Sequence, residues 1–174
     1  GGPCAIENRD HALFMAEAIA KICEKLDIPW IYKSCYDKDC RSSPKSFHGV
    51  GIDEGLKILS EVRDKFSVPV VSDFSDASWG AATGEVCDMV QVPAYLCRQT
   101  SILRAAAQTN RPILLKKGQF MSPWNMKNSC RKLEAFGNEQ IILADRGTFM
   151  GYNMLVNDMT SFPIMSYTGY PVCY

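Results

Sequence analysis

Charged side chains follow several short apolar runs of this chain, close to the points where those runs end. The set comprises Lys33, Asp73, Lys116, Lys117, Asp145 and Arg146. If the runs are parallel strands, their carboxyl ends gather at one rim, and in a βα barrel that rim carries the active site. A strand can also end in polar residues only because it reaches solvent. Because the pattern repeats after four runs, we interpret it as a site.

Cations are concentrated at or just beyond these strand ends, although the chain as a whole has 19 Lys+Arg against 19 Asp+Glu. They are Lys33, Lys38, Arg41, Arg98, Lys116 and Arg146. Fixed cations bind phosphates and carboxylates through charge-assisted hydrogen bonds. A solvated basic rim with scattered acidic partners is the alternative. We favour an anionic small molecule, because a rim is concave and concave sites hold small ligands.

The apolar runs have the length and composition of buried strands. They cover residues 28–32, 68–71, 89–92, 113–115, 141–143 and 172–174. Nearly continuous apolar runs are typical of parallel strands that are covered on both faces.

Helical periodicity separates the runs. One apolar stripe consists of Met15, Ile19, Ile22 and Leu26, and a second of Ile52, Leu56, Leu59 and Phe66. Ser122 and Pro123 predict an N-cap and first helical residue for a segment that carries Met126, Cys130 and Leu133 and stops at Gly137-Asn138. This alternation predicts an α/β fold with a parallel sheet, either doubly wound or closed into a barrel. Gly49-Val50-Gly51 lacks the third glycine of a dinucleotide-binding loop, which disfavours the doubly wound reading.

Composition excludes several classes of protein. With 47% apolar residues and a net charge of zero, the chain is neither a disordered segment nor a basic nucleic-acid module. Charged residues interrupt every long apolar stretch, so no membrane span is expected. No linker-like segment divides residues 1–174, and we expect a single domain.

Eight cysteines are scattered along the chain without a Cys-x-x-Cys pair. A disulfide scaffold is typical of shorter secreted chains, so we interpret them as reduced thiols in a cytoplasmic compartment. A structural zinc site is not expected, because its usual paired spacing is missing.

Six segments closely resemble, in order and spacing, the motifs of the 3-deoxy-D-manno-octulosonate 8-phosphate synthase family. They are Gly2–Glu7, Lys33–Lys38, Arg41–Ser43, Gln91–Thr100, Lys116–Phe120 and Asp145–Gly147. The resemblance implies a (β/α)8 TIM barrel that condenses phosphoenolpyruvate with arabinose 5-phosphate and releases phosphate. Positioning and charge stabilisation would do most of the catalytic work in such a reaction.

The resemblance also implies roles for individual residues. Phosphoenolpyruvate would be held by Lys33, Lys116, Arg146 and the backbone of Ala94. The sugar phosphate would be contacted by Lys38, Arg41, Ser42 and Gln119. Arg98 would serve a phosphate near a subunit contact of a homotetramer, and Asp73 would act at the reacting centre. No nucleic-acid or membrane partner is expected.

Cys4 carries the expectation of a metal. Family members with Cys at this position resemble metal-dependent enzymes, whereas members with Asn need no metal. A thiolate is a ligand for zinc or iron, and manganese is a further candidate; the family adds a His, a Glu and an Asp, which we expect beyond residue 174. From the residue alone, a lone Cys is a small buried hydrophobic residue.

Departures from the family pattern keep alternatives open. Cys40 stands where the family has Asn, and Ser75 stands where it usually has His. The segment 41–47 also resembles that of the related 3-deoxy-D-arabino-heptulosonate 7-phosphate synthases. The alternatives are therefore that related synthase activity or a phosphosugar-binding barrel that has lost its chemistry.

Length sharpens the fold prediction. A (β/α)8 barrel typically takes about 250 residues, whereas this chain has 174. Six strand runs and the fragment around Cys4 predict a barrel truncated after about the seventh strand, with a sheet that cannot close.

Overall fold

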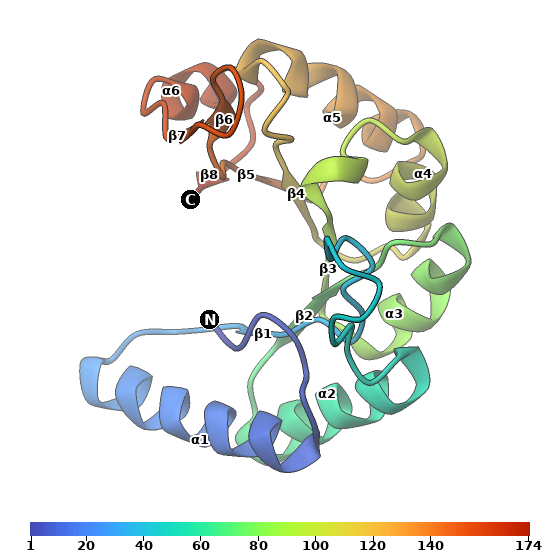
Figure 1. Cartoon of the computed structure of the whole chain (residues 1–174), viewed down its shortest axis with the longest axis vertical. Helices are drawn as coiled ribbons and strands as arrows, with labels where there is room; N and C mark the ends of the chain where they lie inside the picture. Colours follow the sequence, from blue (N-terminus) through green and yellow to red (C-terminus); the bar gives the residue numbers. More distant parts are fainter.

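A computed structural model describes residues 1–174 and contains one six-stranded parallel sheet in the order β1-β2-β3-β4-β5-β8. The strands are β1 Tyr32–Lys33, β2 Val70–Asp73, β3 Met89–Val92, β4 Ile113–Lys116, β5 Ile141–Ala144 and β8 Val172–Cys173. The sheet curls into an open C, with the helices on its convex side (Figure 1). A parallel bridge between Ala5 and Cys35 adds a seventh position beside β1. The predicted truncated TIM barrel is confirmed.

Six helices connect the strands. They are α1 Arg9–Leu26, α2 Ile52–Phe66, α3 Gly80–Val86, α4 Thr100–Gln108, α5 Met126–Ala135 and α6 Ser161–Ser166. Single 3₁₀ turns η1 Ala77–Trp79, η2 Ala94–Leu96 and η3 Pro123–Asn125 precede α3, α4 and α5. A small antiparallel hairpin of β6 Thr148–Phe149 and β7 Leu155–Val156 lies between β5 and α6. None of the helices is both long and apolar enough to cross a membrane.

Side chains alternate between the two faces of the sheet. Val90, Ile113 and Leu143 are fully buried and belong to one apolar core with helix residues such as Leu59 and Leu103. The other face of the strands lines a concave cleft. Successive strand residues point to opposite faces, so of two neighbouring residues at a strand end one points into the core and the other into the cleft.

Each of the six predicted strand runs is confirmed as a strand, although most boundaries shift, and the shift is largest at the first run. The first run was expected to begin at Ile28, but β1 begins at Tyr32 and Ile28 is exposed. Pro29 follows Ile28 and has no backbone N–H to offer to a neighbouring strand.

The helix indicated by the first stripe is confirmed as α1, but the stripe is not the buried face of that helix. Helix α1 buries Ala12, Leu13 and Ala16, whereas Ile22 and Leu26 are exposed. The cause is position: α1 lies at the open edge of the curled sheet (Figure 1), so no helix packs on its second side. The stripe in α2 is confirmed, with Leu56 and Leu59 buried and Ile52 and Phe66 packed against the core.

The third helical prediction is confirmed except for its cap. Met126, Cys130 and Leu133 are buried, and the helix ends before Gly137, which adopts a φ of 89°. Ser122 occupies the N-cap position of η3, yet its side chain makes no capping hydrogen bond.

Candidate functional site

A thiol and a carboxylate hold two lysines together where β1 and β2 end. Lys33 Nζ donates to Cys35 Sγ at 2.8 Å, and Lys38 Nζ donates to the same sulfur at 2.7 Å. Lys38 Nζ also lies 3.7 Å from Asp73 Oδ2, with only 11% and 12% of the two side chains exposed. The second oxygen of Asp73, Oδ1, is buried and has no hydrogen-bond partner. The cluster therefore presents fixed charges and one free acceptor.

The charges in this cluster stabilise one another. Burial alone would raise the pKa of Asp73, but the nearby Lys33 and Lys38 outweigh burial and the pKa is lowered. Burial alone would lower the pKa of Lys38, but the combined attraction of Asp73 and Cys35 raises it. Burial, followed by the charge of Asp73, raises the pKa of the Cys35 thiol. At neutral pH the cluster consists of a carboxylate, ammonium groups and a neutral thiol.

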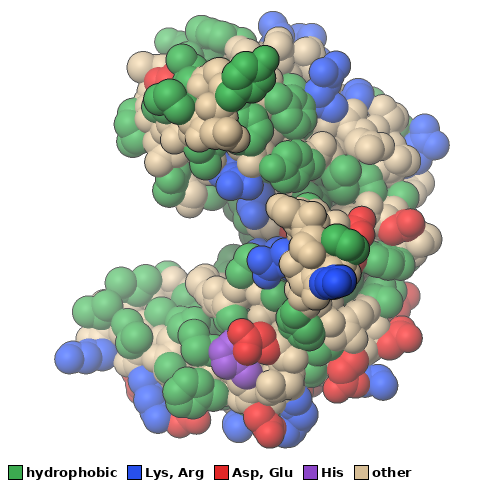
Figure 2. Space-filling model, in the orientation of Figure 1, with side chains coloured by type: hydrophobic (Ala, Val, Ile, Leu, Met, Phe, Trp, Pro, Cys, Tyr) green, Lys and Arg blue, Asp and Glu red, His purple; other side chains and the backbone are tan.

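Two further cations enter the same cleft from β4 and β5. Lys116 ends β4 and Arg146 follows β5, and both line the cleft of about 840 Å³ together with Lys33. Neither Lys116 nor Arg146 forms an ion pair with a carboxylate. Burial, followed by repulsion from Lys33, lowers the pKa of Lys116. Figure 2 shows basic side chains in the hollow between the two arms of the molecule.

A second, smaller pocket of about 160 Å³ adjoins Lys38 and Asp73. Pro93 and Tyr95, at the end of β3, form part of its wall. Ala94 lies between them and is buried. The segment after β3 therefore reaches the site as the sequence predicted, although the contact of the Ala94 backbone with a ligand stays a prediction.

Other predicted site residues lie elsewhere in the structure. Arg41 and Ser42 are exposed in the loop before α2, where Arg41 lines a separate hollow with Glu7. Arg98 lines a different pocket with Lys132. Hence the structure does not bring these three residues into the main cleft, and their roles stay predictions.

Gln119 is buried in the loop after β4. Its side-chain Oε1 has no hydrogen-bond partner, whereas its backbone carbonyl accepts from Phe149 at 2.9 Å. The free side-chain acceptor is compatible with the predicted sugar contact.

Cys4 lines the cleft and is exposed. Residues 1–174 contain no cluster of three His, Cys, Asp or Glu side chains that could hold a metal ion. Since a zinc site takes four ligands, three of them from protein in catalytic sites, these residues alone do not make one. Residues 1–174 therefore do not complete a metal site by themselves, and the metal expected at Cys4 with further ligands beyond residue 174 stays a prediction.

Sequence reasoning missed two polar residues of the candidate site. Cys35 was interpreted as a packing thiol, and the signal was its place between Lys33 and Lys38. Gln91 lines the cleft and is almost fully buried, with its Nε2 unpartnered. An amide inside the apolar run Met89–Val92 was the available signal, because a buried polar group without a partner is costly.

The fold and cleft define part of a βα barrel with a cation-lined cleft at the carboxyl ends of its strands. A family model described as "DAHP synthetase I family" matches residues 1–173, and the chain belongs to that family.

Similar proteins from three Rickettsia species carry the name 2-dehydro-3-deoxyphosphooctonate aldolase. The proteins of Rickettsia rickettsii (strain Sheila Smith) and Rickettsia conorii (strain ATCC VR-613 / Malish 7) are each 51% identical to this chain over 173 residues. The protein of Rickettsia prowazekii (strain Madrid E) is 50% identical over 173 residues. In each case the match covers 99% of this chain and 63% of the relative, so the chain spans less than two thirds of the relatives' length.

Proposed function

We propose that this chain supplies the substrate-binding half of a 3-deoxy-8-phosphooctulonate synthase. This transferase condenses phosphoenolpyruvate with arabinose 5-phosphate and water, and gives 3-deoxyoctulosonate 8-phosphate and inorganic phosphate. The observation that carries the proposal is the set of three cations without carboxylate partners, Lys33, Lys116 and Arg146, on one concave cleft.

Phosphoenolpyruvate fits these three cations. Its phosphate and carboxylate carry the charges that the cleft lacks, and a bidentate guanidinium such as that of Arg146 suits either group. The attraction of an anion beside Lys116 would offset the desolvation and the repulsion that lower the pKa of this lysine. Binding therefore relieves an unfavourable charge arrangement in the free protein.

The reacting centre lies beside Lys38 and Asp73. In the proposed reaction C3 of phosphoenolpyruvate forms a bond to the aldehyde carbon, water adds at C2, and the C2–O bond to phosphate breaks. The Lys38 ammonium is suited to donate to the aldehyde oxygen as negative charge develops there. The unpartnered Oδ1 of Asp73 is suited to accept a hydrogen from the attacking water.

The names of the relatives favour this reaction over that of the heptulosonate synthases. The number of carbon atoms in the product also distinguishes the two reactions. A seven-carbon product needs a four-carbon aldose phosphate, and an eight-carbon product needs a five-carbon one. The non-catalytic alternative is motivated by Cys40, which is exposed, and by Ser75, whose hydroxyl donates to Asp37 at 3.4 Å.

Binding is the first test. Isothermal titration calorimetry of the 174-residue chain with phosphoenolpyruvate should show one site, and Lys116→Met should weaken it by about tenfold or more, the value of a charge-assisted hydrogen bond. Lys127→Met, on α5, is the matched control. Equal affinity in the chain and in the Lys116 variant would contradict the assignment of the cleft.

Turnover is the second test. A chimera in which residues 1–173 replace the matching part of the Rickettsia rickettsii relative is mixed with phosphoenolpyruvate and a four- or five-carbon aldose phosphate, and phosphate release is measured. Release only with the five-carbon sugar supports the proposal, and release only with the four-carbon sugar supports the heptulosonate alternative. Binding without release in either mixture supports the non-catalytic one. A parallel assay with a chelator tests whether the Cys4 metal is needed.

Assembly and location are inferred from the resemblance. We infer a homotetramer with Pro93–Thr100 near a subunit contact, in the cytoplasm, where thiols stay reduced. All eight cysteines are free in the structure. Sedimentation equilibrium of the chimera and of its Arg98→Ala variant tests the subunit contact.

A further inference from the structure

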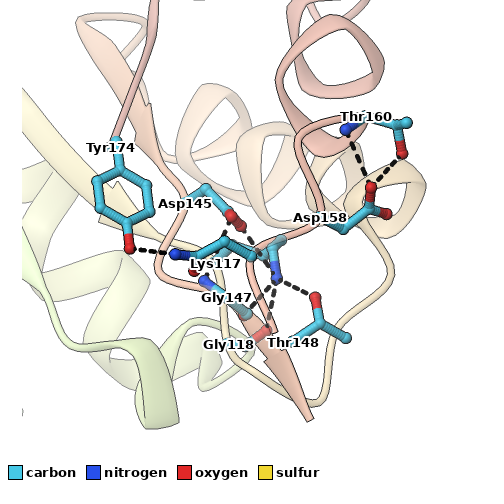
Figure 3. A network of polar contacts seen from close by, with 9 residues as sticks. Lys117, Gly118, Asp145, Gly147, Thr148, Asp158, Thr160 and Tyr174 are labelled. Atoms are coloured by element: carbon cyan, nitrogen blue, oxygen red, sulfur yellow. Dashed lines mark hydrogen bonds and ion pairs between the residues drawn. The ribbon is translucent and has the colours of Figure 1, made fainter. Parts of the chain in front are cut away.

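An ion pair with no exposed surface lies directly behind the cations of β4 and β5. Lys117 Nζ is 3.1 Å from Asp145 Oδ1, and both side chains are 0% exposed. The same ammonium donates to the carbonyl of Gly147 at 2.9 Å and to Thr148 Oγ1 at 3.1 Å (Figure 3). The proposed reaction uses neither Lys117 nor Asp145.

Strand alternation relates this pair to the cleft. Lys116 and Arg146 line the cleft, and Lys117 and Asp145 are their immediate neighbours in sequence. Asp145 also borders the cleft, although its side chain is fully buried. Successive side chains of a strand point to opposite faces, so Lys117 and Asp145 continue the helix-facing rows. In β4 that row is Ile113, Leu115 and Lys117, and in β5 it is Ile141, Leu143 and Asp145; the four aliphatic members are buried.

Backbone hydrogen bonds continue past the strand ends at this point. The N–H of Lys117 donates to the carbonyl of Ala144 at 2.8 Å, and the N–H of Asp145 donates to that of Cys173 at 2.9 Å. Gly147 has a φ of 91°, so the chain turns directly after Arg146. The carbonyl of Gly147 binds Lys117, and its N–H donates to Asp145 Oδ2 at 3.3 Å. The turn that carries Arg146 is therefore hydrogen-bonded to both members of the ion pair.

Stability alone does not account for a charged pair in this place. Replacing a buried ion pair by aliphatic residues of similar volume is often neutral or stabilising, and the two rows are otherwise aliphatic. What the pair supplies instead is geometry, because an ammonium shared by Asp145, Gly147 and Thr148 fixes the positions of those groups relative to β4.

We propose that Lys117 and Asp145 are positioning residues that hold Lys116 and Arg146 at the separation required by one anionic ligand. The proposal rests on the proposed function, since that function assigns phosphoenolpyruvate to these two cations. Acting through the backbone, the pair of fully buried side chains sets the distance between two cleft cations.

Three variants of the 174-residue chain separate positioning from stability. Asp145→Asn leaves a buried ammonium without a counter-charge, Lys117→Met does the reverse, and the double variant Lys117→Met/Asp145→Leu removes both charges. Glu17→Gln, which breaks the exposed Glu17–Lys21 pair on α1, is the control. Thermal unfolding measures stability, and calorimetry with phosphoenolpyruvate and with inorganic phosphate measures binding.

We expect both single variants to unfold at lower temperature and to bind phosphoenolpyruvate at least tenfold more weakly. The double variant should recover most of the unfolding temperature but not the affinity, whereas the control should change neither. A purely structural pair predicts that affinity returns with stability. Recovery of wild-type affinity in the double variant would overturn the proposal.

Hydrogen–deuterium exchange gives a readout that needs no ligand. The double variant should exchange faster in residues 116–121 and 145–149, with no change in α2. If the unmodified chain binds neither anion, the proposed function fails, and the exchange result still decides whether the pair orders these segments.

Should the three variants fail to fold, Thr148→Val removes a single contact of Lys117 and should weaken phosphoenolpyruvate binding two- to fivefold with unchanged unfolding temperature. Unchanged binding in that variant would count against the proposal.

Discussion

The two ends of the candidate site, one where β1 and β2 end and the other where β4 and β5 end, manage positive charge in opposite ways. At β1 and β2, Lys38 lies between the sulfur of Cys35 and the carboxylate of Asp73. At β4 and β5, Lys116 and Arg146 line the cleft without a carboxylate partner. The pKa shifts follow this difference: that of Lys38 is raised in spite of burial, and that of Lys116 is lowered by burial and by Lys33.

The difference separates chemistry from binding. A charge that is neutralised within the protein is held in place before a ligand arrives, which is what a reacting centre requires. A desolvated cation without a partner gains most from an incoming anion. Under the proposed function, Lys38 and Asp73 at the β1–β2 end serve the reaction, whereas Lys116 and Arg146 at the β4–β5 end capture phosphoenolpyruvate together with Lys33.

Removing the carboxylate should produce the largest effect. In the chimera, Asp73→Asn should slow phosphate release at least about 100-fold, the usual contribution of a positioned acid or base. Affinity for phosphoenolpyruvate should stay equal or rise, because a negative charge leaves the cleft. Asp76→Asn, at an exposed position three residues further on, is the control. Parallel losses of turnover and affinity would contradict the division into two ends.

Removing the cation at the other end should weaken binding while sparing the fold. Lys116→Met should lower affinity for phosphoenolpyruvate by about 10- to 100-fold, yet the free energy of unfolding should stay equal or increase, because a desolvated charge is lost. Urea denaturation of the 174-residue chain measures the second quantity. A clear loss of stability would show that the charge of Lys116 is balanced by other groups of the protein.

The sequence was sufficient for the strands and their charged ends because both depend on local patterns. Buried parallel strands are short apolar runs, and Lys33, Asp73 and Lys116 lie at the ends of such runs. The direction shared by parallel strands then places these residues on one rim without further information. The resemblance added which anion the rim would hold.

Contacts between distant segments could not be predicted from those patterns. The stripe of α1 fits a core helix, but only the tertiary arrangement shows that α1 lies at the open edge of the sheet and that Ile22 and Leu26 are exposed. The Lys117–Asp145 pair joins residues 28 positions apart. In the sequence, each of the two is a charged residue after an apolar run, which is also what a strand end in solvent looks like. The placement of Arg41 depends on a loop without helix or strand, where periodicity carries no signal.

The pH dependence of stability should have the same sign at both ends but fall in different pH windows, because the pKa values of Lys116 and Asp73 are both lowered. Because the pKa of Lys116 is lowered, the unfolded chain binds more protons between the folded pKa and about 10.5, and stability gained through this group rises with pH in that window. The pKa of Asp73 is lowered too, so its stabilisation is present above its unfolded pKa and is lost as pH falls through the folded pKa. Urea denaturation at a series of pH values measures both effects. Lys116→Met should abolish the rise of stability at high pH, and Asp73→Asn should abolish the loss of stability at low pH. If either pH dependence persists in its variant, it belongs to another group.

The smallest effect is expected at Cys35, because its thiol is neutral and acts only as an acceptor. A serine hydroxyl can accept from Lys33 and Lys38 in the same place, so Cys35→Ser should change phosphoenolpyruvate affinity by less than about threefold. Cys35→Val has a similar size but no acceptor, and it should destabilise the chain by about 1–3 kcal/mol because two part-buried ammonium groups lose a partner. Calorimetry and urea denaturation of the two variants distinguish the role of Cys35 as a hydrogen-bond acceptor from any role that needs the thiol itself. If serine were as damaging as valine, the sulfur itself would be needed, and the β1–β2 end would then depend on thiol chemistry rather than on fixed charge.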